Sequence, residues 1–362
     1  MSRLDELIKE FCPNGVEYKK LKEVASVSIG EFVHKNKQNP NGVYPVYNGG
    51  TSNTGFYDEF NRTANKIIIS ARGANAGFVN RVFVDFWAGN SCYTISVKEK
   101  YLDWNFTYYV LKNSENKLIN EQQKGGIPAV SKKQVEEFYI PLPPLPVQQE
   151  IVRILDNFTE LTAELTAELT ARRKQYEYYR DLLLTFGDDI SWCNLEEILK
   201  IRNGKDYKSF NVGNIPVYGS GGIMTYIDTY AYDKPSVLIP RKGSIDKLYY
   251  VEKPFWTVDT IFYTEIYTSK VIPKYVFYCL QKERLEQYNT AGGVPSLTQT
   301  VLNKVKIPVP PIEEQERIVA ILDRFDALCN DLTSGLPAEI EARQKQYEYY
   351  RDKLLSFKEV TA

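Results

Sequence analysis

Glycine-rich turns that carry cations and amide side chains are the features of this sequence best suited to chemistry. YNGGTSN (47–53) and YGSGG (218–222) are polar turns, and ARGANAG (71–77) and RKGSIDK (241–247) place cations beside glycines. QQKGGIPAVSKK (122–133) adds further lysines. Arg and Lys can hydrogen-bond to guanine edges or neutralise phosphates, while Asn and Gln can hydrogen-bond to adenine. The candidate nucleic-acid contacts are Tyr47, Asn48, Arg72, Asn75, Lys124, Lys132, Lys133, Tyr218, Ser220, Arg241, Lys242, Ser244 and Lys247.

These turns occur twice, at matching places, and the repetition carries more weight than any single turn. A glycine beside an arginine is common wherever a strand runs into a turn. Both sets, however, lie in basic segments: residues 15–146 hold 16 Lys and Arg against 12 Asp and Glu, and residues 195–311 hold 15 against 11. Residues 147–194 and 312–362 are acidic, with 5 against 9 and 7 against 11. The pattern indicates two surfaces for a polyanion such as DNA.

Signatures of an enzyme or of a metal site are missing from the sequence. It contains no P-loop, no GxGxxG after a strand, no HExxH and no GxSxG. His34 is the single histidine, and the five cysteines are scattered without a CxxC pair. We therefore predict no catalytic residue, no metal ligand and no cofactor bound by this chain. Because no run of about 18 apolar residues and no signal-peptide core occur, we expect a cytoplasmic protein.

The chain consists of two similar copies in tandem. IPLPPLPVQQEIVRILDNF (140–158) recurs as IPVPPIEEQERIVAILDRF (307–325), and ARRKQYEYYRDLLLTF (171–186) recurs as ARQKQYEYYRDKLLSF (342–357). Shorter matches in the preceding segments keep the same period, which is roughly 170 residues. The copies agree closely in these two segments and only at scattered positions elsewhere. This uneven similarity suggests that the similar segments bind two identical partners. The divergent segments would bind two different targets.

A long helix is predicted at the end of each copy. Prolines precede residue 147, and neither glycine nor proline then occurs until Gly187. Apolar residues recur at alternating steps of three and four, which is the heptad pattern of a coiled coil. In the second helix, SGLP (334–337) is expected to kink or interrupt the chain. The residues assigned to the seam between the helices are Ile151, Leu155, Phe158, Leu165, Leu169, Tyr176, Tyr179, Leu183, Ile318, Leu322, Phe325, Tyr347, Tyr350 and Leu354.

Residues 160–171 of the first helix spell ELTAELTAELTA, one four-residue unit written three times. Glu, Leu and Ala favour helix and Thr is tolerated, so each unit lengthens the helix without breaking it. One unit advances a helix by about 6 Å, which equals roughly two base pairs of B-DNA. We expect this segment to set a distance between the parts on either side of it. A neutral duplication in a tolerant helix is the alternative interpretation.

These patterns predict an α+β fold with two globular mixed α/β domains and two long coiled-coil helices. Runs such as KIIISARG (66–73) are typical of buried strands that end in a turn. Residues 7–21 resemble the segment that leaves the first long helix, so the two ends of the chain are expected to lie near each other. The predicted boundaries are 1–146 for the first globular domain, 147–190 for the central helix, 191–311 for the second globular domain and 312–362 for the distal helix.

The repeated segments also resemble a known family. IPLPPLPVQQEIVRILD and IPVPPIEEQERIVAILD, each followed by a long helix that ends in RxKQYEYYRDxLL, are similar to segments of type I restriction–modification specificity subunits. The resemblance, which covers nearly the whole chain, implies two target-recognition domains separated by two antiparallel helices in a pseudo-two-fold repeat. Each domain would recognise one half of a split DNA site.

The same resemblance implies partners and their cofactors. The helices would dock two modification subunits, which bind S-adenosylmethionine and methylate adenine. Restriction subunits, which hydrolyse ATP with Mg, would join the complex. The sequence thus favours a non-catalytic DNA-recognition subunit. Two alternatives are an enzyme fused to its DNA reader, which the missing motifs oppose, and a coiled-coil interaction protein without a DNA function, which leaves the matched basic turns unexplained.

Overall fold

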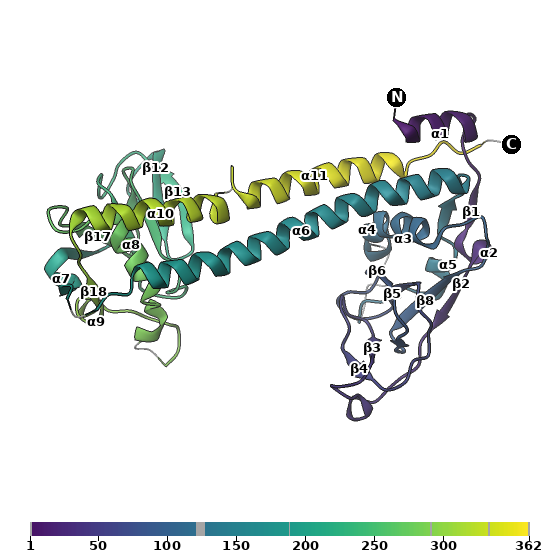
Figure 1. The fold of residues 1–362 in the computed structure, drawn as a ribbon, viewed down its shortest axis with the longest axis horizontal. Helices are drawn as coiled ribbons and strands as arrows, with labels where there is room; N and C mark the ends of the chain where they lie inside the picture. The colour runs from purple at the N-terminus through teal and green to yellow at the C-terminus, as the bar shows by residue number, and fades with distance from the viewer. Residues whose placement is uncertain (1, 121–126, 188, 290–291, 332–333, 361–362) are drawn as a thin grey trace. The chain divides into compact units, whose positions relative to one another are not determined.

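The chain folds into two compact units, each of which combines a globular part with segments of long helix (Figure 1). The first unit comprises Met1–Glu164 together with Ile340–Ala362, and the second comprises Leu165–Glu339. In the part of the chain that the structure describes, no helix is both long and apolar enough to cross a membrane. This computed structural model describes residues 2–120, 127–187, 189–289, 292–331 and 334–360.

The globular part of the first unit is built on an antiparallel sheet with the strand order β2-β8-β5-β6. A second sheet has the order β4-β3-β7, with β3 and β7 parallel, and a two-stranded ribbon pairs β1 with β9. The strands are β1 (Tyr18–Lys20), β2 (Ala25–Ile29), β3 (Tyr44–Tyr47), β4 (Gly55–Tyr57), β5 (Lys66–Ser70), β6 (Val79–Val82), β7 (Trp87–Ala88), β8 (Cys92–Val97) and β9 (Tyr139–Pro141). The helices are α1 (Arg3–Phe11), α2 (Leu21–Val24), η1 (Lys35–Lys37), α3 (Trp104–Asn113), α4 (Glu115–Asn120) and α5 (Lys132–Glu136).

The second unit repeats this plan strand for strand, as the duplicated sequence requires. Its sheets have the orders β11-β17-β14-β15 and β13-β12-β16, and its ribbon pairs β10 with β18. The strands are β10 (Trp192–Asn194), β11 (Leu199–Asn203), β12 (Val212–Gly219), β13 (Gly222–Ile227), β14 (Ser236–Pro240), β15 (Tyr249–Val251), β16 (Trp256–Thr257), β17 (Ile261–Ile266) and β18 (Lys306–Pro308). The helices of the globular part are α7 (Leu195–Ile198), α8 (Pro273–Lys282), η2 (Leu285–Tyr288) and α9 (Gln299–Leu302). The predicted mixed α/β domains are confirmed.

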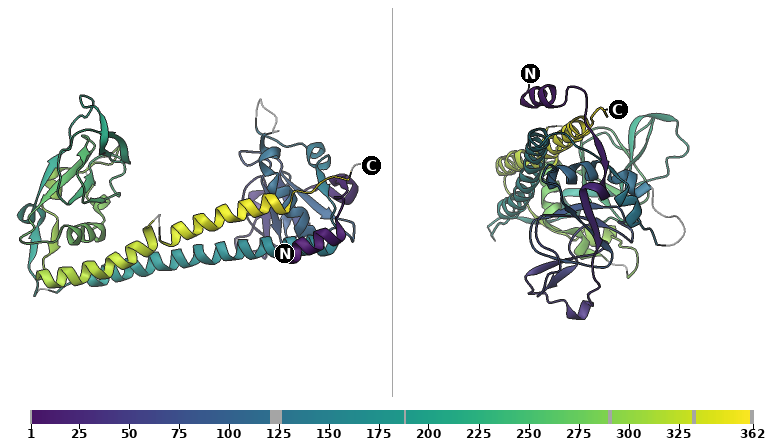
Figure 2. Two further views of the ribbon diagram at one scale, coloured as in Figure 1. Left: turned by 90° about the horizontal axis from the view of Figure 1, so that it is seen from above. Right: turned by 90° about the vertical axis from the view of Figure 1, so that its right-hand side faces the viewer.

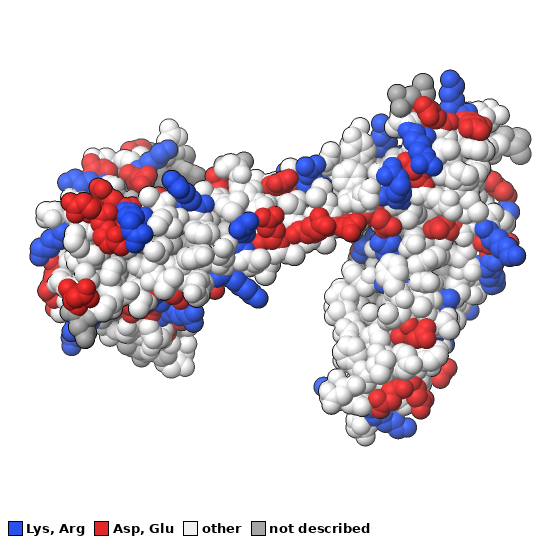
Figure 3. Space-filling view, viewed as in Figure 1, with Lys and Arg blue, Asp and Glu red and all other residues white. Residues whose placement is uncertain are grey.

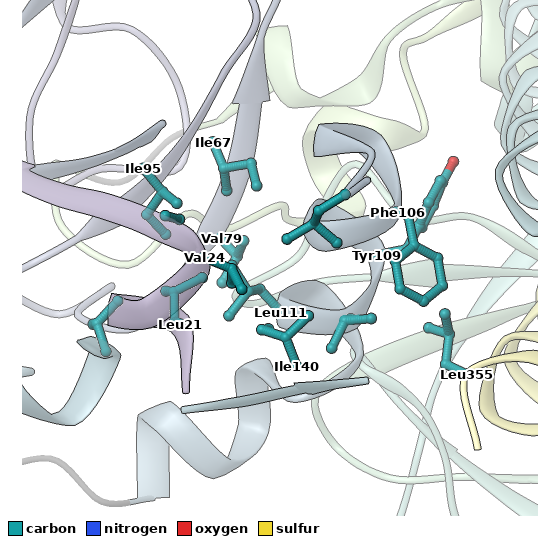
Figure 4. Close-up of a cluster of buried hydrophobic side chains, with 14 of the residues drawn as sticks. Leu21, Val24, Ile67, Val79, Ile95, Phe106, Tyr109, Leu111, Ile140 and Leu355 are labelled. Atoms are coloured by element: carbon teal, nitrogen blue, oxygen red, sulfur yellow. The ribbon is translucent and has the colours of Figure 1, made fainter. Parts of the chain in front are cut away.

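A hydrophobic core in each unit joins the sheet to the long helices. In the first unit, β5 lies between two neighbours and its last four residues are all buried, which explains the continuous apolar run. Figure 4 shows Ile67 of β5 and Ile95 of β8 in the same cluster as Phe106 of α3 and Leu355, which follows the last long helix. The corresponding cluster of the second unit holds β14 and α8 side chains together with Ile318 and Leu322.

The long helices are α6 (Leu145–Leu183), α10 (Ile312–Asn330) and α11 (Leu336–Leu354). Within the first unit, Phe158 of α6 stacks on Tyr350 of α11, with ring centroids 5.6 Å apart. Within the second unit, Tyr179 of α6 stacks on Phe325 of α10 at the same separation, 5.6 Å. Residue numbers rise along α6 as they fall along α11 and α10, so the helices are antiparallel (Figures 1 and 2).

The seam residues become less buried toward the middle of α6. Ile151, Leu155, Tyr176, Ile318 and Leu322 are buried. The others are half-buried, except that Tyr179 and Tyr350 expose part of their stacked rings: Phe158, Leu165, Leu169, Leu183, Phe325, Tyr347 and Leu354. Between Leu155 and Tyr176, no side chain of α6 is fully buried. The ELTA units lie in this stretch.

The interruption predicted near SGLP is confirmed, because α10 ends at Asn330 and α11 begins at Leu336. Gly335 occupies the turn between them, and a Cβ atom there would lie 2.6 Å from the carbonyl oxygen of Ala327. Any side chain at this position would clash with the end of α10. The other long helix, α6, begins at Leu145, two residues before its predicted start, with Pro146 in its first turn.

The two ends of the chain meet in the first unit, as predicted from residues 7–21 (Figure 2). Val16 pairs with Glu359 in a parallel bridge: its N–H donates to the carbonyl of Lys358 at 2.8 Å, and its carbonyl accepts from Val360. Gly15 has a positive φ of 106°, and a Cβ there would lie 2.4 Å from the Lys358 oxygen. The last residues therefore complete the globular part that the first residues begin.

A buried glutamine fixes the first turn of each long helix to the globular part before it. Gln148 Oε1 accepts from the N–H of Asp103 at 2.8 Å, and its Nε2 donates to the carbonyls of Tyr101 and Pro143. In the second unit, Gln315 makes the same three contacts: Oε1 accepts from Ile272 at 2.8 Å, and Nε2 donates to the carbonyls of Lys270 and Pro310. Both side chains are fully buried. Each buried amide thereby has hydrogen-bond partners for both its oxygen and its nitrogen, which a buried polar side chain requires.

Gln148→Ala is expected to destabilise the chain by about 1–3 kcal/mol, because it removes three hydrogen bonds of a fully buried side chain and leaves a cavity in its place. The neighbouring Gln149 is exposed, so Gln149→Ala should change the free energy of unfolding by less than about 0.5 kcal/mol. Chemical denaturation of both variants measures the difference. Equal stability of the two variants would contradict the role assigned to Gln148.

Candidate nucleic-acid interface

Three turns that are far apart in the sequence converge at one edge of the first globular part. The turn after β5 (residues 71–77) pairs with residues 127–133, which we call the third turn. Arg72 and Ala129 form an antiparallel bridge, and the N–H of Gly73 donates to the carbonyl of Pro128 at 2.9 Å. The loop between β3 and β4 joins them, since Ser70 Oγ donates to the carbonyl of Gly50 at 2.9 Å. A polar surface from three separate segments is thereby held on the end of a buried strand.

Glycine is needed where these turns touch. A Cβ atom at Gly49 would lie 2.2 Å from the carbonyl oxygen of Arg72, so only glycine lets the two backbones approach so closely. Around this contact, Arg72 and Asn75 are exposed. Asn48 is half-buried over Gly89, and Tyr47 is half-buried with its ring 5.7 Å from that of Phe86. Arg72 and Asn75 are therefore accessible to a ligand, while Tyr47 also serves the core.

The same convergence occurs in the second globular part. Lys242 and Ser296 form an antiparallel bridge, and the N–H of Gly243 donates to the carbonyl of Pro295 at 3.0 Å. Thr260 joins the hairpin turn between β12 and β13 to the turn after β14. Its Oγ1 accepts from the N–H of Ser220 at 3.3 Å, and its carbonyl accepts from the N–H of Arg241 at 2.9 Å.

The cations of the second convergence differ in their accessibility. Lys242 and Lys247 are exposed, and Ser220 and Ser244 are half-exposed. The Arg241 guanidinium is half-buried over the ring of Phe262, 5.2 Å from its centroid, and its Nε has no hydrogen-bond partner among the described residues. Tyr218 is half-buried between Tyr249 and Phe255, and burial raises the pKa of its hydroxyl. Arg241 is thus held over the ring of Phe262.

The lysines of the third turn lie at the start of α5. Ser131 caps this helix, with its Oγ accepting from the N–H of Gln134, so Lys132 and Lys133 stand in the first turn and are exposed. Lys132 Nζ lies 3.3 Å from Glu136, and Lys133 lines a hollow with Lys117. Lys124 lies outside the described residues. In the second unit, the equivalent helix α9 begins with Gln299 and Thr300, so its first turn carries no charge.

The two bridges also show how the cations of the two units correspond. The bridges show that Lys242 is the counterpart of Arg72, and that Arg241 is the counterpart of the buried Ala71. The second convergence therefore has one additional cation, Arg241, where the first has an apolar residue.

Comparison with known proteins agrees with this arrangement. Residues 13–172 and 188–342 match the family described as the type I restriction modification DNA specificity domain. The chain belongs to this family. It is 33% identical to a putative type I restriction enzyme specificity subunit of Haemophilus influenzae over 94% of this chain and 96% of the relative. It is 35% identical to the EcoR124I/EcoR124II specificity subunit of Escherichia coli over 70% of each chain. This chain is accordingly a DNA-specificity subunit of the type I restriction–modification class, as the resemblance predicted.

Solved structures support the fold. The crystal structure of the type I restriction–modification S subunit of M. genitalium matches with a TM-score of 0.68 at 21% identity, over 94% of this chain and 96% of that one. A second structure, from work on the assembly and conformational transition of a type I system, matches with a TM-score of 0.59 at 18% identity, covering 95% and 98%. The arrangement of two repeated α/β domains with long helices is therefore that of specificity subunits.

Two features of the site could not be predicted from the sequence patterns. Thr260 joins the hairpin turn to the Arg241 turn, but a threonine after a strand carries no signal of its own. Ile223 and Met224, at the start of β13, are exposed beside the hairpin turn, although their apolar types suggest burial. Only the strand pairing, which joins distant segments, reveals either role.

Lys242→Ala is expected to weaken binding of specific duplex DNA by the restriction–modification complex and to lower the slope of log affinity against log salt by about one. The matched control is Lys234→Ala, because Lys234 is also exposed but precedes β14, whereas Lys242 follows it. Fluorescence anisotropy titrations at several salt concentrations measure both variants. An unchanged slope for Lys242→Ala would remove this turn from the interface.

Proposed function

We propose that each globular part recognises one half of a split DNA site, that the long helices set the spacing between the halves, and that they dock two modification subunits. The observation that carries this proposal is the repeated convergence of three turns, alike in backbone but different in side chains. Arg72 and Lys242 occupy equivalent places, while Arg241 stands where the first unit has Ala71. Equivalent frames with different side chains suit two half-sites of different sequence.

We also propose that the chain itself does no chemistry. His34, the single histidine, is exposed in a loop with its ring 4.7 Å from that of Phe32. Burial raises the pKa of Cys92 and of Cys279 to about 12, so both remain neutral thiols rather than nucleophilic thiolates. S-adenosylmethionine would bind to the modification subunits, and ATP and Mg to restriction subunits. In this proposal, the compartment of the complex is the cytoplasm, where its DNA lies.

The experiment that tests this function is a single-molecule methylome of cells that express the chain with its modification subunit. Adenine methylation at one split sequence, with two fixed halves and an unread spacer, is the expected result. Purified chain alone, incubated with labelled S-adenosylmethionine and DNA, should transfer no label. Methylation by the lone chain, or methylation at a continuous short site, would contradict the proposal.

The motif KQYEYYRD on α6 favours a docking role for the helices. Its first tyrosine, Tyr176, is buried in the core of the second unit, and its third, Tyr179, stacks on Phe325. The second, Tyr178, is 64% exposed, and its ring rests edge-on against Tyr179 with centroids 5.4 Å apart. An exposed aromatic ring held by a neighbouring ring is typical of a protein–protein contact.

The second copy of the motif, on α11, divides its tyrosines in the same way. Tyr350 stacks on Phe158, and Tyr349 is 62% exposed with its ring 5.3 Å from that of Tyr350. Because the same residue is exposed at the same place in both copies, two identical partners would find identical anchors. The two copies therefore suit two modification subunits, one on each unit.

Tyr178→Ala and Tyr349→Ala should each weaken the binding of one modification subunit by about tenfold, because each removes a preformed aromatic anchor. Native mass spectrometry of the reconstituted complex should find one subunit bound to each single variant and none bound to the double variant at limiting concentration. Tyr267→Ala, which removes an exposed tyrosine from a globular part, is the control and should retain both subunits. Full occupancy of the double variant would exclude these anchors.

The ELTA units suit a spacing role because of where they lie. Residues 145–164 of α6 belong to the first unit and residues 165–183 to the second, so the repeat spans their junction. Its glutamates, Glu160, Glu164 and Glu168, are exposed, and their spacing of four residues places them on one face of α6. Figure 3 shows a row of acidic side chains on the long helices. Such a row repels phosphate, so this stretch is suited to separate the two DNA contacts rather than to add a third.

Deletion of one ELTA unit, residues 160–163, is expected to change the unread spacer by about one or two base pairs, since four residues advance a helix by about 6 Å. Both half-sites should stay the same. Glu164→Gln alters the repeat without altering its length, so the spacer should be unchanged. Methylomes of strains with the wild-type chain, the deletion and Glu164→Gln provide the measurement. An unchanged spacer after the deletion would rule out a spacing role for the ELTA units.

A further inference from the structure

The hairpin of β12 and β13 in the second unit exposes two apolar side chains at consecutive positions. Tyr218 pairs with Ile223, but Val217 pairs with Thr225, so Met224 is the extra residue of a β-bulge. In a regular strand, consecutive side chains point to opposite faces. The bulge breaks this alternation, and Ile223 is 50% exposed and Met224 is 58% exposed. The sequence thus places apolar surface in solvent at the start of β13.

This apolar pair is continuous with the candidate interface. Ser220, in the turn just before it, donates its N–H to Thr260 Oγ1, and its carbonyl accepts a hydrogen bond from the Tyr249 hydroxyl at 3.2 Å. Thr260 in turn accepts from the N–H of Arg241. Met224 also lines a hollow with Lys208 and Thr260. The turn that carries the apolar pair is therefore joined through Thr260 to the strand end that carries Arg241 and Lys242.

The equivalent hairpin of the first unit lacks this feature. There β3 and β4 pair without a bulge, with Val46 opposite Gly55, and the seven residues NGGTSNT (48–54) join them. The first hairpin thus presents amides and hydroxyls where the second presents Ile and Met. Since the frames are otherwise alike, the difference points to the ligand of each unit rather than to folding.

We propose that Ile223 and Met224 contact the 5-methyl group of a thymine in the half-site of the second unit, and that the first unit makes no equivalent contact with a thymine methyl group. This proposal rests on the proposed DNA-recognition function. The major groove, about 12 Å wide, admits a two-stranded ribbon, and the thymine methyl is the one apolar group that base edges present there. Arg241 and Lys242, on the same surface, supply hydrogen bonds to bases and phosphates.

The test uses the complete methylating complex and its site, once a methylome has defined the site. Duplexes are made in which 2′-deoxyuridine replaces thymine in one half-site or in the other, which removes only the methyl group. For the wild-type chain, replacement in one half-site should weaken binding by about fourfold per contacted thymine, the value of one buried methyl-sized group. Replacement in the other half-site should leave the affinity unchanged.

Variants of the hairpin assign the effect to its residues. The double variant Ile223→Ser with Met224→Ser should bind the thymine and the uracil duplexes equally, whereas Met224→Leu, which keeps the apolar surface, should retain the preference. Val212→Ser is the matched control, because Val212 is 91% exposed at the far end of the same hairpin. Melting temperatures of the variants verify that they are folded.

Each outcome decides a different claim. Failure of the wild-type complex to bind any specific duplex overturns the proposed function itself. Specific binding that ignores uracil in both half-sites, or a thymine preference that survives the double serine variant, overturns only the role of Ile223 and Met224. Loss of the preference in the double variant, together with its retention in Met224→Leu and Val212→Ser, supports that role.

Discussion

The fold depends most on the buried attachment of each long helix to its globular part. Gln148 and Gln315 enter this contact with all three hydrogen-bonding groups satisfied, and both are fully buried. A second contact follows about two turns later, where the hydroxyl of Tyr109 bonds to Asp156 at 2.5 Å and that of Tyr278 bonds to Asp323 at 2.5 Å. Because these polar groups are expensive to leave unpaired, the direction of each helix relative to its own domain is firmly fixed.

Because each long helix is firmly attached to its own domain, the side chains of the convergent turns and the length of α6 can vary separately. The convergent turns stand on the ends of buried strands, so their side chains can change without altering the sheet below. The middle of α6 has no buried side chain, so its length can change without disturbing either core. The exposed tyrosines Tyr178 and Tyr349, in contrast, lie within the most similar segments of the two copies. The proposed function therefore assigns target sequence, spacing and docking to different residues.

Local patterns predicted the elements better than they predicted the site. The apolar run of β5 and the heptads of α6 are local signals, and both elements formed as expected. The pairing of Arg72 with Ala129 joins segments more than 50 residues apart, and no local sequence pattern predicts it. The bulge at Met224 likewise depends on the register of two strands. The roles of the candidate contacts on DNA stay predictions.

The central claim is that each globular part recognises its own half-site independently of the other. The ribbons β1–β9 and β10–β18 close the two parts with matching pairs, Tyr18 with Pro141 and Trp192 with Pro308, which provides equivalent junctions for an exchange. A chain in which a copy of residues 18–141 replaces residues 192–308 should therefore fold and dock as before. Its methylome should contain two copies of the first half-site, separated by a spacer. Retention of the second half-site, or loss of all site-specific methylation by a chimera that still assembles, would contradict the account.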